Sequence, residues 1–454
     1  MATKPSKRTL TAKSQDILNA IRNNASANYR DYVPAATDDA SIREIGKVIM
    51  DWPALQNEFL SALINRIGLV LITSKLYDNP WARFKRGMLD YGETIEEIFV
   101  NIADPFEYDP ERAESELFKR EFPDVRSAFH TLNYRKFYKV TIQDYELKQA
   151  FLSAGGVAEL IGRIIEQLYT AANYDEFVTM KYLLARHLLN GRMHPIEVDA
   201  APANADYKPL VTTVKAVSNE IEFPSSLYNL AGVFQYTKKA NQNVIINTKL
   251  DAALDVNVLA SAFNMSKVEF MGKRILVNSF SLTNDENTRL LKLMKDDPNF
   301  KPLTQAERDA LDTIPMVIVD DDFWMVYDNL NVFKEQENGQ GLYWNYFYHQ
   351  WKIFSVSPFS NAIVFVPGAP VVTGITVTPT TITAEPGTTF SINTTIDTAN
   401  FAPETVTYES DNAGVTVDPM GVVSIADDAT GTANIVVAST FDPTVTATVV
   451  VTIA

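Results

Sequence analysis

The sequence predicts an α+β fold for the greater part of the chain, followed by a separate all-β sandwich. Two observations predict the α+β part: a long helical pattern in the first half of the chain, and a mixture of β-like runs and helices after it. A change to threonine- and valine-rich alternation after residue 367 predicts the sandwich. With 454 residues and 46% hydrophobic content, the chain is long enough for two or three domains, each with its own core.

Composition excludes several kinds of chemistry before any motif is considered. The chain has no cysteine, which removes disulfides, thiolate zinc sites and cysteine nucleophiles. Its net charge of −16 argues against tight binding of nucleic acid, because an acidic surface repels phosphates. No run of about 18 uncharged apolar residues occurs, and no apolar segment follows the basic N-terminus, so neither a membrane span nor a signal peptide is expected.

The charge is distributed unevenly along the chain. No lysine or arginine follows Lys352, whereas nine carboxylates lie between Val371 and Ala454. The last segment is therefore predicted to be a distinct domain, joined to the rest by a short linker at Pro367 to Pro370.

The N-terminal part is predicted to be an arm, residues 1–50, and a helix that joins it to the core, residues 51–70. The arm is basic at first and then helical, with Leu18 and Ile21 on one face, and a loosely ordered end is the alternative. Asp51 is expected to cap the joining helix. The apolar residues of this helix recur at every fourth position: Leu55, Phe59, Leu63 and Ile67.

Residues 71–122 are predicted to form an extended loop, a long hairpin of short β-like runs broken by turn residues. Charged side chains dominate its middle, so it has little core of its own and is expected to lie against a neighbouring molecule. A solvated hairpin whose charges have no consequence is the alternative. The candidate assembly contacts are its charged residues Arg83, Lys85, Arg86, Glu93, Glu96 and Glu97.

Residues 123–194 are predicted to contain one long helix, from Val157 to Asn190. The pattern starts after Gly155-Gly156 and stops before Gly191, which are residues that favour helix ends. At 1.5 Å per residue such a helix would be roughly 50 Å long. A break near Asn173, giving two shorter helices, is the alternative.

Residues 195–342 are predicted to form a mixed α+β domain with a polar insertion, residues 281–312, on its surface. Strand-like runs such as "NVIIN" and "MVIVDDDFWMVYD" accompany a helical run, "LDVNVLASAF". Asp320 to Asp322 form the densest group of carboxylates. We expect a solvated turn here rather than a cation site, because no calcium-loop spacing surrounds these residues.

Residues 343–367 are predicted to begin with a buried central strand. With period two, aromatic side chains fall on both of its faces, and such a strand needs cover on both faces. We expect it to lie along the long helix, at a junction between domains or subunits. The rings assigned to it are Tyr343, Trp344, Tyr346, Phe347, Tyr348 and Trp351.

The sandwich is predicted over residues 371–454. Phe390, Ile392 and Ile396 share one face of a strand. Pro386-Gly387 and Asp418-Pro419 supply turns between strands.

No catalytic or cofactor motif is found. The sequence has no phosphate-binding loop, no dinucleotide fingerprint and no nucleophile elbow. His187 and His194 are close in sequence, but Gly191 and Pro195 break the helical spacing that a paired metal site uses. We therefore expect neither an enzyme nor a metal or cofactor. A glycan hydrolase is the least favoured hypothesis, because no pair of carboxylates is nominated for it.

Five stretches of the chain carry a family resemblance: "TIEEIFVNI", "TIQDYELKQAF", "LDVNVLASAFNM", "FWMVYDNL" and "GLYWNYFYHQWKIFSVSPFSNAIVFV". They closely resemble the major capsid proteins of small podoviruses similar to phi-29, over most of residues 40–367. This resemblance implies the tailed-bacteriophage capsid fold of Hong Kong 97 type. Residues 71–122 would then be its extended loop, the long helix the spine of the peripheral domain, and residues 195–342 chiefly the axial domain.

The final segment resembles the bacterial immunoglobulin-like domain of group 2, through "GVVS" and "GTANIVVAS". Members of the same phage family carry such a domain.

The resemblance implies a non-enzymatic capsid protein whose copies form the hexamers and pentamers of a phage head shell around double-stranded DNA. The implied partners are further copies, a separate scaffolding protein, a portal protein and, weakly, the packaged DNA. The implied location is the virion shell, after assembly in the host cytoplasm. The alternative is a phage or cell-surface adhesin that uses the C-terminal domain, and a surface fibre or host contact through that domain is a further expectation.

Overall fold

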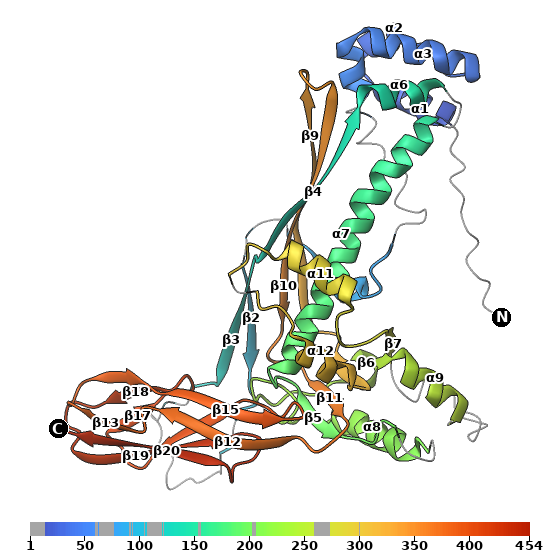
Figure 1. The fold of residues 1–454 in the computed structure, drawn as a ribbon. Helices are drawn as coiled ribbons and strands as arrows, with labels where there is room; N and C mark the ends of the chain where they lie inside the picture. The colour runs from blue at the N-terminus through green and yellow to red at the C-terminus, as the bar shows by residue number, and fades with distance from the viewer. Residues whose placement is uncertain are drawn as a thin grey trace. The chain divides into compact units, whose positions relative to one another are not determined.

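A computed structural model describes residues 14–59, 62, 77–89, 92, 94–103, 105–106, 120, 122–152, 156–201, 206–257, 273–298 and 300–454. Figure 1 labels the helices and strands of the chain. The chain divides into two compact units. The first comprises Met1–Thr94, Thr131–Met180 and Val326–Phe354, and the second comprises Ile95–His130, Lys181–Met325 and Ser355–Ala454. Each unit is described by itself. No helix in the described ranges is both long and apolar enough to cross a bilayer.

The first unit combines a four-stranded sheet with helices. The strand order is β1-β9-β10-β4, with β1 (Lys85–Met88) parallel to β9 (Trp324–Asn338). The strands β10 (Tyr343–Val356) and β4 (Tyr134–Gln143) run antiparallel. The helices are α1 (Ser14–Asn24), α2 (Ala27–Tyr32), α3 (Asp39–Asp51), α6 (Asp144–Leu152) and the first part of α7 (Gly156–Leu189), with a 3₁₀ turn, η1 (Ala82–Phe84).

The core of this unit lies between one face of the sheet and the helices. Trp344, Tyr346 and Tyr348 alternate along β10 and are all buried. They belong to one apolar cluster with Leu168 and Ala172 of α7 and with the buried face of α3. Because side chains alternate along a strand, a single face of β10 supplies all three rings. The predicted placement of this strand along the long helix is confirmed.

The long helix α7 is continuous from Gly156 to Leu189. The alternative of two shorter helices with a break near Asn173 is therefore wrong. Asn173 donates from Nδ2 to the carbonyl oxygen of Tyr77 at 2.9 Å, so its amide bonds outside the helix instead of competing with the helical backbone.

The N-terminal helices begin and end differently from the sequence prediction. Asp38 caps α3, and a capping box pairs it with Ser41. Asp51 is the last residue of α3 and not a cap of the following helix. That helix starts at Pro53, where the carbonyl oxygen of Trp52 accepts from the next turn. The predicted positions Leu63 and Ile67 lie outside the described residues.

The second unit contains a five-stranded sheet in the order β5-β11-β8-β6-β7. Its strands are β5 (His194–Glu197), β6 (Gln242–Asn247), β7 (Lys273–Val277), β8 (Met316–Asp320) and β11 (Ala362–Val366). Every residue of β8 and β11 is buried, as expected for central strands that are covered on both faces. The helical elements are α8 (Lys208–Glu220), η2 (Lys239–Asn241), α9 (Thr248–Asn257), α11 (Asn284–Leu293) and α12 (Gln305–Asp312).

The polar insertion at residues 281–312 contains two helices. Its two helices, α11 and α12, each begin with a capping box, Thr283–Glu286 and Thr304–Glu307. Each capping glutamate also pairs with a cation of α7: Lys181 Nζ lies 2.9 Å from Glu286 Oε2, and Arg186 Nη1 lies 2.7 Å from Glu307 Oε1. Because Lys181 is fully buried, the insertion is anchored to the core.

The prediction of a solvated turn at Asp320 to Asp322 is wrong for its first residue. Asp320 is buried and accepts a hydrogen bond from Thr237 Oγ1 at 2.6 Å. Burial raises the pKa of its carboxyl group, and the hydrogen bond from Thr237 opposes that rise. Asp321 accepts from Asn243 and Lys273.

A two-stranded ribbon in the second unit pairs β2 (Thr94–Val100) with β3 (Val125–Thr131). It continues beyond residue 122, where the sequence placed the end of the extended loop. One face packs onto the unit, with the Phe99 and Phe359 rings stacked at 5.6 Å. The other face exposes apolar side chains: Ile98 is 59%, Val100 58% and Phe129 64% exposed.

Residues 371–454 form an all-β part of the second unit. Its sheets have the orders β12-β15, β13-β20-β19-β16 and β14-β18-β17. A separate apolar cluster fills the space between these strands. The strands are β12 (Val371–Thr378), β13 (Thr381–Ala384), β14 (Thr389–Ser391), β15 (Asn393–Ala399), β16 (Val406–Ser410), β17 (Val415–Val417), β18 (Val422–Ile425), β19 (Gly431–Ser439) and β20 (Thr446–Ile453).

Replacing Gly46 in α3 should destabilise the first unit. A Cβ atom there would lie 2.6 Å from the Cβ of Phe151 on α6, an atom that no rotamer change can move away. We expect Gly46→Ala to lower the free energy of unfolding by about 1 to 2 kcal/mol, although alanine favours a helix over glycine by about 1 kcal/mol. Denaturant unfolding measures this, with Gly339→Ala, which meets nothing within 4 Å, as the control. Equal stability of the two variants would contradict the close contact.

Candidate functional site

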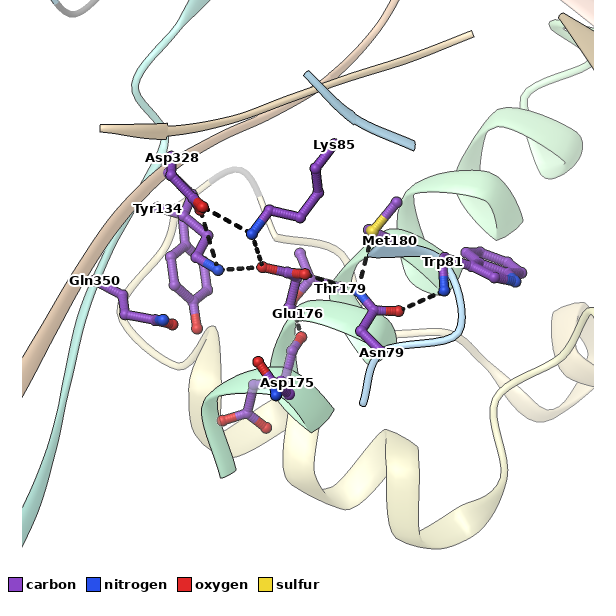
Figure 2. A network of polar contacts seen from close by, with 12 residues as sticks. Asn79, Trp81, Lys85, Tyr134, Asp175, Glu176, Thr179, Met180, Asp328 and Gln350 are labelled. Carbon is purple, nitrogen blue, oxygen red and sulfur yellow. Dashed lines mark hydrogen bonds and ion pairs between the residues drawn. The ribbon is translucent and has the colours of Figure 1, made fainter. Parts of the chain in front are cut away.

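Four charged side chains meet inside the first unit (Figure 2). Glu176 comes from α7, Lys85 from β1, Asp328 from β9 and Lys352 from β10. Glu176 and Lys352 are almost fully buried, with side chains only 3% and 2% exposed. The site thus joins the long helix to three strands of the sheet.

The four groups alternate in charge around the cluster. Lys352 Nζ pairs directly with Glu176 Oε2 and lies 3.3 Å from Asp328 Oδ1. Lys85 Nζ lies 3.1 Å from Glu176 Oε2 and 2.7 Å from Asp328 Oδ2. Two cations therefore face two carboxylates, and the cluster has no net charge. This balance matters because an unpaired charge in a protein interior is strongly unfavourable.

An amide completes the surroundings of Glu176. Asn79 Nδ2 donates to Glu176 Oε1 at 2.8 Å, and Asn79 Oδ1 accepts from the backbone amide of Trp81 at 2.8 Å. The buried Trp81 ring meets the Phe177 ring edge-on at 5.4 Å. Both carboxylate oxygens of Glu176 are thus bonded, and the segment around Asn79 is held against α7.

A second polar chain lies next to the cluster and uses the preceding residue of α7. The Tyr138 hydroxyl donates to Asp175 Oδ2 at 2.9 Å and lies 3.0 Å from the Tyr134 hydroxyl. Asp175 and Tyr134 are buried. Burial, with the nearby Tyr134 and Asp175, raises the pKa of Tyr138 far above its ordinary value, so its hydroxyl remains a donor.

The pKa shifts in the cluster follow from the pairing. Burial disfavours the ionised form of Glu176 and Asp328, but Lys352 and Lys85 outweigh it and hold both pKa values below their ordinary range. Burial also disfavours the charged form of Lys85, but Glu176 and Asp328 raise its pKa above the ordinary value. All three groups are therefore charged at neutral pH.

The cluster is suited to holding structure rather than to chemistry. Its central carboxylate and its Lys352 ammonium are out of reach of solvent, and each is already bonded. In the described ranges, no group of three or more His, Asp or Glu side chains is placed to hold a metal ion. What the arrangement does is fix α7 against β1, β9 and β10 by directional charge pairs.

The charged residues assigned to the extended loop have different surroundings. Lys85 pairs within its own chain with Glu176 and Asp328. Glu97 accepts from Ser357 Oγ at 2.8 Å and lies 3.1 Å from His130 Nε2. Glu93 lies outside the described residues. The side chains of Arg83 and Arg86 in the first unit and of Glu96 on the ribbon of the second unit are exposed.

The aromatic strand is covered on one face only. Trp344, Tyr346 and Tyr348 are buried, whereas Tyr343, Phe347 and Trp351 are half-buried. The expectation of cover on both faces is therefore wrong for a single chain. The reason is that α7 and α3 supply a layer on one side of the sheet, and the rings on the other side instead carry cations of β4.

Sequence reasoning missed Glu176, Asp328 and Lys352. A signal was available for two of them: Glu176 lies beside Phe177 in the apolar pattern of α7, and Lys352 interrupts the aromatic run of β10. A charge at an apolar position indicates a buried partner. The sequence does not say which residue that partner is.

His187 is buried and His194 is half-buried, and each ring packs against an aromatic side chain. The His187 ring meets the Phe323 ring edge-on at 5.6 Å, and the His194 ring meets the Tyr228 ring at 5.2 Å. Burial lowers the pKa of His187 to about 3 and that of His194 to about 4, so both are neutral at physiological pH.

Comparison with known proteins places this architecture among viral shell proteins. A family model described as Phi29-like phage major capsid protein matches residues 18–366. The major capsid protein of Bacillus phage B103 is 34% identical over 425 residues, which are 92% of this chain and 88% of that protein. The major capsid protein of Bacillus phage PZA is 36% identical over 371 residues, 81% of this chain and 76% of that protein.

A solved structure shares the fold. The capsid structure of Staphylococcus phage Andhra covers 65% of this chain and 85% of its own, with a TM-score of 0.50 and 15% sequence identity. At this level of identity the likeness concerns the fold alone, which is that of tailed-phage capsid proteins of Hong Kong 97 type.

Removing the central carboxylate should destabilise the first unit strongly. Glu176→Gln leaves Lys352 buried with Asp328 as its remaining partner in the cluster, so we expect the free energy of unfolding to fall by about 3 to 5 kcal/mol. The double variant Glu176→Gln, Lys352→Met should lose less than the sum of the two single losses, by about 0.5 to 3 kcal/mol. Denaturant unfolding of the unassembled chain measures this, with the exposed Glu337→Gln as the matched control. Additive losses would show that the pair is not coupled.

The pH dependence of unfolding should report the same cluster. Folding lowers the pKa of Glu176 and Asp328 from 4.5 and 3.8, so their stabilisation is complete above these values and is lost as the pH falls through the folded-state pKa values. Folding raises the pKa of Lys85 from 10.5, so its stabilisation is lost only as the pH rises beyond that value. The melting temperature should therefore fall in acid, and less steeply in Glu176→Gln. Identical acid limbs in the two proteins would contradict this assignment.

Proposed function

Because the chain belongs to the family of Phi29-like phage major capsid proteins, we propose that its copies assemble into the head shell of a tailed bacteriophage. The match over residues 18–366 is the observation that supports this proposal most directly. The role is structural and needs no catalysis by this chain. It agrees with a buried charge cluster in which no group is left to act on a substrate.

We infer that the shell is built from hexamers and pentamers around double-stranded DNA. Rings of either kind need head-to-tail contacts that close on themselves. The exposed apolar face of the β2–β3 ribbon, formed by Ile98, Val100 and Phe129, is suited to such a contact with a neighbouring copy. Buried apolar area contributes roughly 25 cal/mol per Å², so this face can supply the affinity while Glu96 beside it influences register.

The proposed partners follow from the same role. A separate scaffolding protein guides assembly, a portal protein occupies one vertex, and the packaged DNA touches the shell only weakly. The net charge of −16 supports the last point, because like charges keep DNA from binding tightly. The proposed location is the virion shell, with assembly in the host cytoplasm.

We also propose that residues 371–454 are an immunoglobulin-like domain of group 2. Their nine short strands, paired mainly antiparallel around a separate apolar core, support this assignment. Within the virion, we propose that this domain makes a surface fibre or a host contact. An adhesin as the function of the whole chain is not retained, because the matched relatives are named major capsid proteins.

Shell assembly should survive removal of the C-terminal segment. We expect the full chain, co-expressed with its scaffolding protein, to form closed shells by electron microscopy, and a chain ending at Pro367 to form them too, because residues 14–366 contain their own cores. Monomers or amorphous material from the full chain would contradict the proposed function. Shells from the full chain but none from the truncated one would show that residues 371–454 are required for assembly.

A further inference from the structure

An open cavity of about 610 Å³ lies within the second unit, where residues of the α+β part meet the C-terminal all-β part. One wall comes from the segment that joins α7 to β5, residues 191–194, and from residues 226–232, which follow α8. The other wall comes from the all-β part, beside β16, at the turn between β17 and β18, and after β19. A cavity of this size can hold a small organic molecule.

The backbone holds the two walls in place. Gly191 approaches the all-β part so closely that a Cβ atom on it would lie 2.4 Å from the carbonyl oxygen of Ala402, which is fully buried. In the first wall, the backbone amide of Ala231 donates to the carbonyl oxygen of Pro358 at 2.9 Å. The cavity is therefore formed before any ligand arrives, and binding would not have to order its walls.

Three side chains of the lining have polar groups that bond to no described residue. They are the guanidinium of Arg192, the ring nitrogens of His194 and the hydroxyl of Ser226. Arg192 and Ser226 are exposed, and His194 is half-buried. The hydroxyls of Thr405 and Thr440, in the opposite wall, differ in that they bond to each other. Hydrogen-bonding capacity is thus left open mainly on the first wall.

The charge of the lining favours an anion. Arg192 is a permanent cation, and none of the described residues that line the cavity is an aspartate or a glutamate. Glu220, whose charge acts on His194 and Tyr228, lies outside the lining. A guanidinium pairs with phosphate oxygens through two parallel hydrogen bonds, so Arg192 is suited to a phosphate group.

The rest of the lining is largely apolar and favours a ring-shaped body. The Leu227 side chain is 55% exposed, and the Phe441 ring lies 6.3 Å from the His194 ring across the two walls. Further apolar residues of the lining are Met193, Pro403, Val406 and Pro419. A ligand that covers this surface gains from the burial of apolar area, which inorganic phosphate alone would leave open.

We propose that this cavity binds a small phosphate monoester with an apolar, ring-shaped body. The Arg192 guanidinium pairs with the phosphate, whose remaining terminal oxygens accept from the Ser226 hydroxyl and from the protonated nitrogen of His194. A single copy supplies every residue of the lining, so the site does not depend on the proposed shell function. Nucleic acid is the less favoured occupant, because a chain with a net charge of −16 repels a polyanion.

Isothermal titration calorimetry of the full, unassembled chain tests the site, with phenyl phosphate as the probe. We expect phenyl phosphate to bind roughly tenfold more tightly than each of three reference compounds. Inorganic phosphate lacks the ring, phenol lacks the phosphate, and benzoate carries a carboxylate in its place. Equal affinity for any of the three would contradict the assigned ligand class, and no binding of phenyl phosphate would overturn the site itself.

Variants locate the binding on the chain. Arg192→Gln should weaken phenyl phosphate binding roughly tenfold, and Arg192→Lys should restore part of it, because lysine keeps the charge but not the planar fork. His194→Phe keeps a ring in the packing but loses the nitrogens, and should weaken binding about threefold. Arg43→Gln, an exposed change on α3, is the matched control and should leave the affinity unchanged. An unchanged melting temperature shows that each variant is folded.

The outcomes separate this proposal from the shell function. Unchanged affinity in Arg192→Gln, or an equal loss in Arg43→Gln, would place the anion elsewhere on the chain and overturn the proposal. A short single-stranded oligonucleotide that displaces phenyl phosphate at equal phosphate concentration would identify nucleic acid as the occupant and overturn it as well. None of these results bears on the formation of closed shells, which electron microscopy tests independently.

Discussion

A carboxylate buried in the middle of a long helix is the constraint on which the first unit depends. Glu176 cannot remain ionised in an apolar core unless cations pair with it, and both of its cations, Lys352 and Lys85, come from outside α7. Lys352 and Lys85 come from different strands, and Asp328 from a third strand balances the second positive charge. Neutrality therefore selects one register of the sheet against the helix. Apolar packing of Trp344, Tyr346 and Tyr348 stabilises the contact between the sheet and the helices, and the charge pairs determine how the sheet and α7 are aligned.

In the second unit, glutamates that cap helices neutralise two cations of α7. Lys181 and Arg186 leave α7 about 1.4 turns apart. Each pairs with a glutamate that already accepts a hydrogen bond from the N-cap amide of another helix. A single side chain thus satisfies an unpaired backbone amide and neutralises a cation. This double use explains why a short polar insertion can dock on a helix that is apolar over much of its length.

What the sequence could predict follows from the range of the interactions involved. Three predictions used local patterns: the helical spacing of apolar residues in α7, the alternation of side chains along β10, and the change of composition at residues 371–454. The structure has a helix, a strand and a separate apolar cluster at these places. The pairing of Glu176 with Lys352 is not local, because a single sequence does not indicate which distant charge is the partner. The prediction that Asp51 caps a helix failed because a residue that can precede one helix can equally be the last residue of the helix before it. The Thr-x-x-Glu capping boxes of α11 and α12 are visible in the sequence, but the prediction of a polar surface insertion did not use them.

The absence of lysine and arginine after Lys352 also affects how proteases can cleave the chain. Enzymes with trypsin-like specificity cut after basic residues, and none is present from Ile353 to the end of the chain. Lys352 itself is sealed against Glu176, so the last basic residue is inaccessible while the first unit stays folded. Residues 371–454 are thus spared by this class of enzyme through their composition, without needing a tightly closed fold.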